Sequence, residues 1–146
     1  MTNNIILLPI LIPLAAAVLT LVIPNTPPRW NSRYQQLHRG GVAFIALIST
    51  AATLVIAALL FRKNINFSVP WAGFGFEFSL RCYNFSSFIM LAASFFGFLI
   101  ALYSSTFLNN KSYAKYFYAY FLITLSFVNG TVLAENLVLL LFFWEG

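Results

Sequence analysis

Charged residues are scarce in this sequence, and long apolar runs take their place. Only 8% of the 146 residues are charged and 61% are apolar, with a mean hydropathy of +0.86. A soluble domain carries about 25% charged residues, so this chain lacks the side chains that would cover a water-facing surface. The sequence therefore predicts an all-α polytopic protein of the cell membrane, with the lipid bilayer as its first partner.

Cysteine and histidine are almost absent. The lone Cys82 cannot form an intrachain disulfide or a metal cluster, and we expect it to be an inert loop thiol. We expect His38, in a basic polar segment, to be a solvated loop residue and not a ligand or proton carrier. The sequence holds no motif for a redox centre, so we expect no metal site and no cofactor in this chain.

The basic residues outnumber the acidic ones, which gives a net charge of +5. In a soluble domain this balance would suggest nucleic acid. Here the basic residues lie between apolar runs, where they orient a membrane protein, so we expect no nucleic-acid partner. Loops on one side hold five of them and loops on the other side three. The side with five is expected in the cytoplasm, which places the N-terminus outside. The five are Arg29, Arg33, Arg39, Lys111 and Lys115, and the three are Arg62, Lys63 and Arg81.

The apolar runs predict five transmembrane helices, the last of them truncated. Their expected ranges are residues 5–23, 42–61, 85–107, 113–133 and 135–146. Pro27 and Pro28 block a helix, so residues 24–41 are predicted as a polar loop. Alternating apolar residues between positions 62 and 84 predict a short β-hairpin between the second and third helices. The last run has half the length of a membrane crossing, so residues 1–146 are expected to form the N-terminal part of one larger membrane domain.

Two prolines interrupt the first of these helices. Pro9 and Pro13 lie four residues apart, so the carbonyls that they leave free lie on one face. Membrane helices tolerate such prolines when neighbouring helices or hydroxyl groups bind the freed carbonyls. We therefore expect these prolines to mark a bend in this helix and not a site.

Glu145 is the carboxylate that lies within a long apolar run, between Trp144 and Gly146. If its helix starts near residue 135, Glu145 lies roughly 15 Å deep, near the middle of the hydrocarbon core. An ionisable group at that depth costs a few kcal/mol and is a functional candidate. Burial favours the neutral form of a carboxyl group, and a cationic partner opposes this. Glu145 is therefore either protonated or paired with a residue outside this sequence, unless the chain is complete and the side chain reaches an interface.

The other two acidic residues have ordinary explanations. We expect Glu77 to form a solvated surface pair with nearby Arg81, which contributes little energy. We expect Glu135 to lie at the start of the last helix, where a carboxylate favours the helix N-terminus.

The segment 133–146 ends in Phe-Trp-Glu-Gly and resembles the fifth helix of antiporter-like membrane subunits. This superfamily includes the proton-pumping subunits of respiratory complex I, the membrane subunits of energy-converting hydrogenases and the Mrp-type cation/proton antiporters. Residues 78–81 leading into Ser86 resemble the outer hairpin and the start of the third helix, and residues 101–104 resemble its end. The resemblance covers residues 74–146, and residues 1–73 agree only in layout.

This resemblance implies further helices, an outer N-terminus and a hairpin between the second and third helices. In the family the fifth-helix glutamate, here Glu145, pairs with a lysine of the seventh helix and takes part in proton transfer along the membrane midplane. The implied partners are other membrane subunits of a respiratory or hydrogenase complex, and the implied ion is the proton, with sodium as the alternative. Many complex I relatives have Asp-Gly where this chain has Tyr83-Asn84, which favours a hydrogenase-type or divergent branch.

Three functions stay open at this point. The main prediction is proton translocation, with Glu145 in the path, by a non-redox subunit of an energy-converting oxidoreductase. The alternative is a stand-alone or Mrp-type sodium/proton antiporter subunit, which uses the same carboxylate without electron transfer. The third is a small structural membrane subunit, complete at residue 146, whose last half-span is re-entrant and covered by protein.

Overall fold

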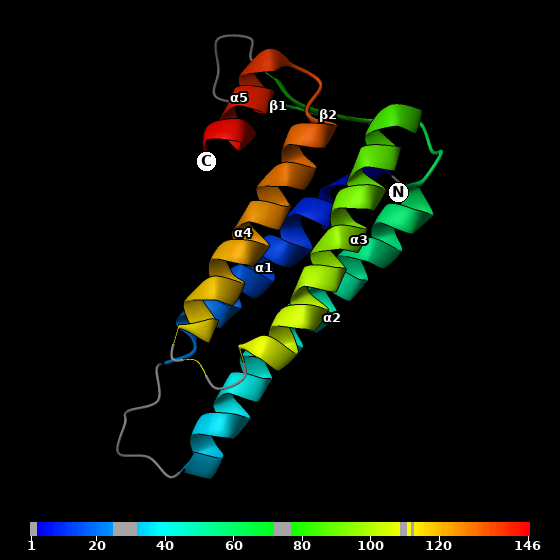
Figure 1. The fold of residues 1–146 in the computed structure, drawn as a ribbon. Helices are drawn as coiled ribbons and strands as arrows, with labels where there is room; N and C mark the ends of the chain where they lie inside the picture. The colour runs from blue at the N-terminus through cyan, green and yellow to red at the C-terminus, as the bar shows by residue number, and fades with distance from the viewer. Residues whose placement is uncertain (1–2, 25–31, 72–76, 109–110, 112) are drawn as a thin grey trace.

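The computed structural model describes residues 3–24, 32–71, 77–108, 111 and 113–146. Within them the chain forms a bundle of long helices with a two-stranded hairpin at one end (Figure 1). The elements are η1 (Asn3–Leu7), α1 (Leu8–Val22), α2 (Ser32–Leu60), β1 (Ile65–Pro70), β2 (Glu77–Cys82), α3 (Asn84–Phe107), α4 (Ala114–Leu133) and α5 (Leu137–Glu145).

Four helices of the described chain are long and apolar enough to cross a membrane. These segments are Asn4–Val22, Gly40–Leu60, Asn84–Phe107 and Ala114–Leu133, and they confirm four of the predicted spans to within a few residues. The fifth helix, α5, has 9 residues and a length of only about 14 Å. A fifth transmembrane helix therefore stays a prediction.

Helix α2 begins earlier than the sequence predicted. Residues 24–41 were predicted as a polar loop, but α2 starts at Ser32 and continues without a break to Leu60. The prediction was wrong for residues 32–41 because it took their polar composition as a sign of a loop. Proline blocks a helix, but none occurs between Pro28 and residue 41, so nothing prevents a helix there. The backbone at His38 is helical, and its side chain lies outside the described residues.

The four long helices pack around one another. Helix α1 packs against α2 and α4, and α3 packs against the same two helices. At the end away from the hairpin, Lys115 Nζ donates to Ile23 O at 2.6 Å and so binds a carbonyl at the C-terminus of α1. A cation at this position also complements the helix dipole.

Pro13 interrupts the backbone hydrogen bonds of α1, and a side chain of α4 replaces the missing donor. Pro13 lies inside the helix and has no N–H, so the carbonyl of Pro9 loses its helical donor. Asn129 Nδ2 donates to Pro9 O at 3.0 Å, and Ser126 Oγ donates to Ile10 O at 2.7 Å. Asn129 therefore supplies the donor that the Pro9 carbonyl lacks within α1, and Ser126 binds the next carbonyl, that of Ile10; both residues belong to α4.

The predicted β-hairpin is also confirmed. Strands β1 and β2 are antiparallel, with Ile65 opposite Cys82 and Pro70 opposite Glu77. The connection through residues 72–76, which includes Gly73, lies outside the described residues. Leu80 and Cys82 are buried, so the hairpin covers the end of the bundle and does not project freely from it.

Candidate functional site

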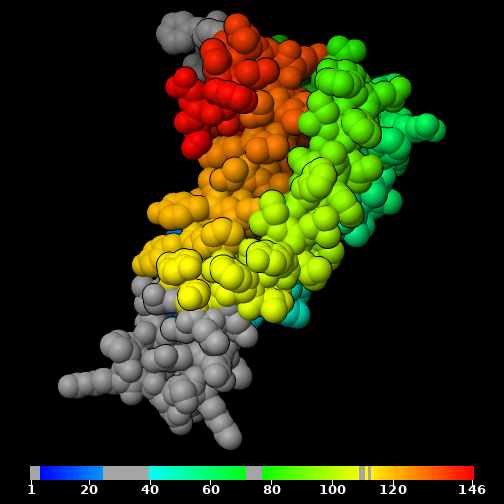
Figure 2. Space-filling view, in the orientation of Figure 1, coloured from blue at the N-terminus to red at the C-terminus, as the bar shows by residue number. Residues whose placement is uncertain are grey.

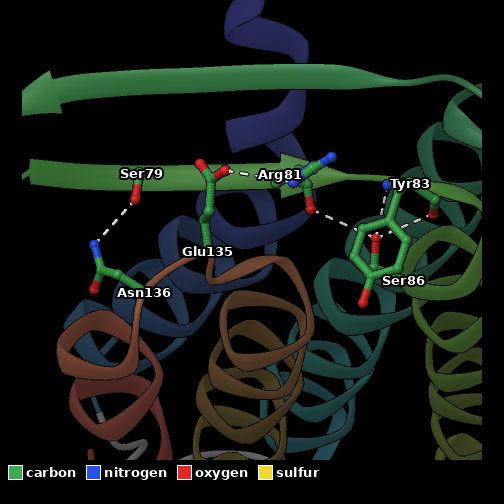
Figure 3. Close-up of polar contacts among 6 residues, drawn as sticks. All are labelled: Ser79, Arg81, Tyr83, Ser86, Glu135 and Asn136. Atoms are coloured by element: carbon green, nitrogen blue, oxygen red, sulfur yellow. Dashed lines mark hydrogen bonds and ion pairs between the residues drawn. The ribbon is translucent and has the colours of Figure 1, made fainter.

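The candidate site is α5, and the short connection that precedes it is bound to the hairpin. Ala134 forms an isolated antiparallel bridge with Leu80, and Glu135 N donates to Ser79 O at 3.0 Å. Residues 134–135 therefore run alongside β2 for a short distance, on the side away from β1 (Figure 3). These backbone hydrogen bonds fix the point at which the chain turns from α4 into α5.

Asn136 joins this connection to the helix itself. Its Nδ2 donates to Glu77 O at 2.8 Å and to Ser79 Oγ at 3.0 Å, while its Oδ1 accepts from Leu139 N at 2.7 Å. One side chain therefore caps α5 and anchors it to β2 (Figure 3). Glu135 was expected at the start of this helix, but α5 begins two residues later, at Leu137, and its N-cap is Asn136. An Asn directly before an apolar run is a recognised N-cap signal, so the sequence does carry a sign of the correct start.

Glu135 instead faces Arg81, and this corrects the predicted surface pair. Arg81 Nη1 lies 3.8 Å from Glu135 Oε1. Glu77 and Arg81 belong to one strand and lie four residues apart, about 13 Å along it, whereas Glu135 comes from the connection that runs beside β2. The side chains of Arg81 and Glu135 are 55% and 38% exposed, so their attraction adds little stability.

Aromatic rings hold the next turns of α5. Trp71 meets Phe142 edge to face with ring centroids 5.5 Å apart, and Phe78 meets Phe143 at 6.3 Å. On its other side Phe143 contacts Phe127 of α4 at 6.0 Å. Such contacts contribute about 0.5–1.5 kcal/mol each beyond the area that they bury. They clamp α5 between the hairpin and α4.

A glycine of α4 permits this close approach. A Cβ atom on Gly130 would lie 2.5 Å from Cδ1 of Phe143, so no larger residue fits without a shift. Further along α5, a Cβ on Gly146 would lie 3.1 Å from the ring of Phe127. Phe127 lies six residues before the end of α4 at Leu133, which is roughly 9 Å along the helix.

Glu145 is the last residue of α5 and lies at about this level, between the middle of α4 and its hairpin end. The first turns of α5 lie beside the hairpin, and the expected depth of Glu145 in the membrane stays a prediction. The side chain is exposed and borders a surface hollow of about 500 Å³, together with Leu141, Phe142 and Gly146. Figure 2 shows α5 on the flank of the hairpin-side part of α4.

Glu145 forms no ion pair or hydrogen bond within the described part of the chain. The basic residues whose side chains the structure describes lie at the two ends of the helices, at positions 62–63, 81, 111 and 115. No group of three potential metal ligands occurs among the described residues. The carboxylate is thus an accessible acid–base group, and nothing that the structure describes neutralises it.

Cys82 lies in β2, which corrects the expectation of a loop thiol. Its side chain is 1% exposed, and Sγ lies 3.9 Å from Leu60 O, where it donates a weak hydrogen bond. Burial raises the pKa of the Cys82 thiol, and a hydrogen bond with the Ser86 side chain offsets part of that effect. The thiol is therefore held in its protonated, unreactive form.

Comparison with curated proteins finds similarity, along most of the chain, to components of cation/proton antiporters. The A/B subunit of a probable K(+)/H(+) antiporter of Rhizobium meliloti (strain 1021) is 26% identical over 137 residues, which cover 93% of this chain and 13% of the relative. The A1 subunit of an Na(+)/H(+) antiporter of Staphylococcus haemolyticus (strain JCSC1435) is 28% identical over 142 residues, and that of Staphylococcus aureus (strain bovine RF122 / ET3-1) is 28% identical over 137. Each of these two matches covers 89% of this chain and 17% of the relative.

No family model matches the sequence. The similarities support a location in a membrane and kinship with antiporter-like membrane subunits. They give no support to the predicted place in a NADH:quinone oxidoreductase or hydrogenase complex, and they favour the antiporter alternative. The chain spans only 13–17% of the length of these relatives.

Proposed function

We propose that this chain is the N-terminal part of a monovalent cation/proton antiporter subunit, in which Glu145 transfers protons. One observation carries the proposal: α5 presents an accessible carboxylate, unpaired within the described residues, on the flank of a membrane-length helix. The names of the relatives, which describe exchange of K(+) or Na(+) for H(+), supply the reaction class.

A single carboxylate has the chemistry that such an exchange requires. The ionised form attracts a cation, and the protonated form is neutral and releases it, so one group can serve two ions in turn. Its intramembrane position makes the charged form dependent on a partner or on water. We place that partner in residues beyond this sequence or in a second subunit, in keeping with the family resemblance.

The remaining parts of the proposal concern orientation and assembly. The distribution of basic residues supports an outer N-terminus, with the hairpin also outside. Much of the bundle surface is apolar, including Phe44, Phe85 and Phe96, each more than 60% exposed, and suits lipid or other membrane subunits. The proposed partners are other membrane subunits of the antiporter.

The test is a Glu145→Gln substitution in the full-length protein, assayed in everted membrane vesicles. Antiport is measured as collapse of a preformed pH gradient after addition of Na⁺ or K⁺ in separate runs. Glutamine keeps the size of glutamate but cannot release a proton, so we expect activity to fall to that of vesicles lacking the protein. The amount of assembled protein should stay unchanged.

Glu135→Gln is the matched control. It removes a carboxylate ten residues away, whose only described ion pair is the exposed one with Arg81. We expect this variant to retain antiport. Normal activity of Glu145→Gln with either cation would contradict the proposal, and it would favour a structural role for α5.

A further inference from the structure

Two apolar clusters lie near the two ends of the four-helix bundle, and inward-facing polar residues lie between them. The hairpin-side cluster contains Ile10, Ala57, Met90 and Leu133, one from each of α1–α4. The opposite cluster contains Ala17, Val42, Leu108 and Leu122, drawn from the same helices and the end of α3. Between these positions every helix places a small, polar or proline residue in the interior. We call this set the middle layer, and it consists of Pro13, Ser49, Thr50, Thr53, Ser94, Gly97, Ser126 and Asn129.

Several hydroxyls of the middle layer have a described acceptor. Thr50 Oγ1 donates to Ala46 O at 2.9 Å, Thr53 Oγ1 donates to Ser49 O at 2.8 Å, and Ser126 Oγ reaches α1. These bonds satisfy the hydroxyl donors within the helices. Other polar atoms of the layer have no such hydrogen-bond partner.

Three buried polar atoms of the same layer have no described partner. These are Ser49 Oγ on α2, Ser94 Oγ on α3 and Asn129 Oδ1 on α4. Their residues are 4%, 0% and 0% exposed. The orientation of the Asn129 amide is fixed, because the group that faces the Pro9 carbonyl must be the donor, Nδ2. Oδ1 is therefore a buried acceptor that needs a donor from elsewhere.

We propose that the middle layer binds ordered water, held by Asn129 Oδ1 together with Ser94 Oγ and Ser49 Oγ. A buried water makes about three hydrogen bonds to otherwise unpaired polar groups. Water donates to the amide oxygen and can either donate to or accept from a hydroxyl, so it matches this mixture of groups. A buried acceptor that has no hydrogen-bond donor destabilises the folded state.

The chemistry of the layer favours water over a cation. All three acidic residues of the chain are exposed, so none of them faces this interior. A cation here would have only neutral oxygens around it and no opposite charge, which makes its desolvation expensive. The layer is also separate from Glu145, because α5 packs on α4 beside Phe127 and Gly130 and contributes no residue to it.

The first experiment is a structure of the full-length protein in lipid nanodiscs, at a resolution that shows ordered water. We expect a solvent peak within hydrogen-bond distance of Asn129 Oδ1 and of at least one of the two serine hydroxyls. Direct bonds from these hydroxyls to Asn129 Oδ1 or to helix carbonyls, without a peak between them, would overturn the proposal. So would a peak whose height follows the Na⁺ or K⁺ concentration.

A Ser94→Ala variant gives an independent thermodynamic test. If water binds there, the loss of one partner should increase the unfolded-to-folded ratio about two- to tenfold. If the layer is dry, the substitution removes an unpaired hydroxyl and should raise the unfolding midpoint. Thr20→Val is the control, because Thr20 is equally buried and its hydroxyl is bonded to Ala16 O at 2.8 Å within α1. Thr20→Val shows what the loss of one bonded buried hydroxyl costs, and we expect Ser94→Ala to lower the midpoint by a similar amount. A midpoint for Ser94→Ala at or above that of the unsubstituted protein would reject bound water.

Discussion

Helices α1–α4 enclose one another, whereas α5 touches chiefly α4 and the hairpin. In the bundle, polar side chains such as Asn129 are fully buried and bind backbone groups of a neighbouring helix. In α5 only Leu139 and Phe143 are buried, and Trp144 is 74% exposed. The bundle is therefore stabilised by its own interior, while the helix that carries Glu145 depends on attachments at its N-terminal end.

This difference explains why the hairpin matters for the proposed chemistry. The position of the Glu145 carboxylate is set by Asn136, by the ring contacts of Phe142 and Phe143, and by the space at Gly130. All of these lie on the hairpin side of Glu145. Substitutions in the bundle should change global stability, and substitutions at these contacts should change the placement of α5 with little effect on the bundle.

The largest effect is expected for Asn129→Leu, inside the bundle. The variant leaves the Pro9 carbonyl without a donor, because Pro13 has no N–H to replace the lost bond. We expect a loss of about 3 kcal/mol in the free energy of unfolding, measured by denaturation of the full-length protein in detergent.

Pro13→Ala sharpens this prediction in a double-mutant cycle. Alanine at position 13 restores an N–H to the helix ladder, so Pro9 O regains a donor within α1. Asn129→Leu should then cost about 1 kcal/mol less in the Pro13→Ala background than in the native one. Equal losses in both backgrounds would show that Asn129 acts through packing and not through the Pro9 carbonyl.

Gly130→Ala should affect α5 more than the bundle. The added methyl would overlap the ring of Phe143, and such overpacking costs about 1–2 kcal/mol. We expect faster hydrogen exchange of the α5 amides and reduced antiport, with smaller changes in α1–α3. Gly41→Ala is the control, since no atom lies within 4 Å of a Cβ there, and α2 should gain about 0.5–1 kcal/mol. Uniformly faster exchange in all helices would refute a local role for Gly130.

The sequence predicted the long helices and the hairpin because hydropathy and alternation respond to local composition. The ends of α3 and α4 agree with the predicted ranges to within one residue. The start of α2 was missed because its first residues are polar, and a polar helix outside the apolar run gives no hydropathy signal.

The contacts that place Glu145 could not be predicted, because their partners are distant in sequence. Asn136 binds Ser79 and Glu77, which lie 57 and 59 residues away from it in the sequence. The prediction paired Arg81 with Glu77, but the residue that lies beside its guanidinium is Glu135. Residue type singled out Glu145 as the unusual acid, but the hairpin contacts that hold the start of α5 could not be predicted from local sequence.

The smallest effect concerns Cys82, which lies where the hairpin covers the bundle. Since burial raises the pKa of this thiol, the folded state holds its proton more tightly than the unfolded state does. Its contribution to stability is therefore complete below the ordinary thiol pKa and declines as the pH rises above it. We expect slow maleimide labelling at neutral pH that accelerates in alkali, and fast labelling of Leu137→Cys, at the exposed hairpin-side start of α5, in a Cys82→Ser background. If Cys82 labelled as fast as position 137 at neutral pH, the hairpin would open as readily as the start of α5, and the contrast between the two regions would fail.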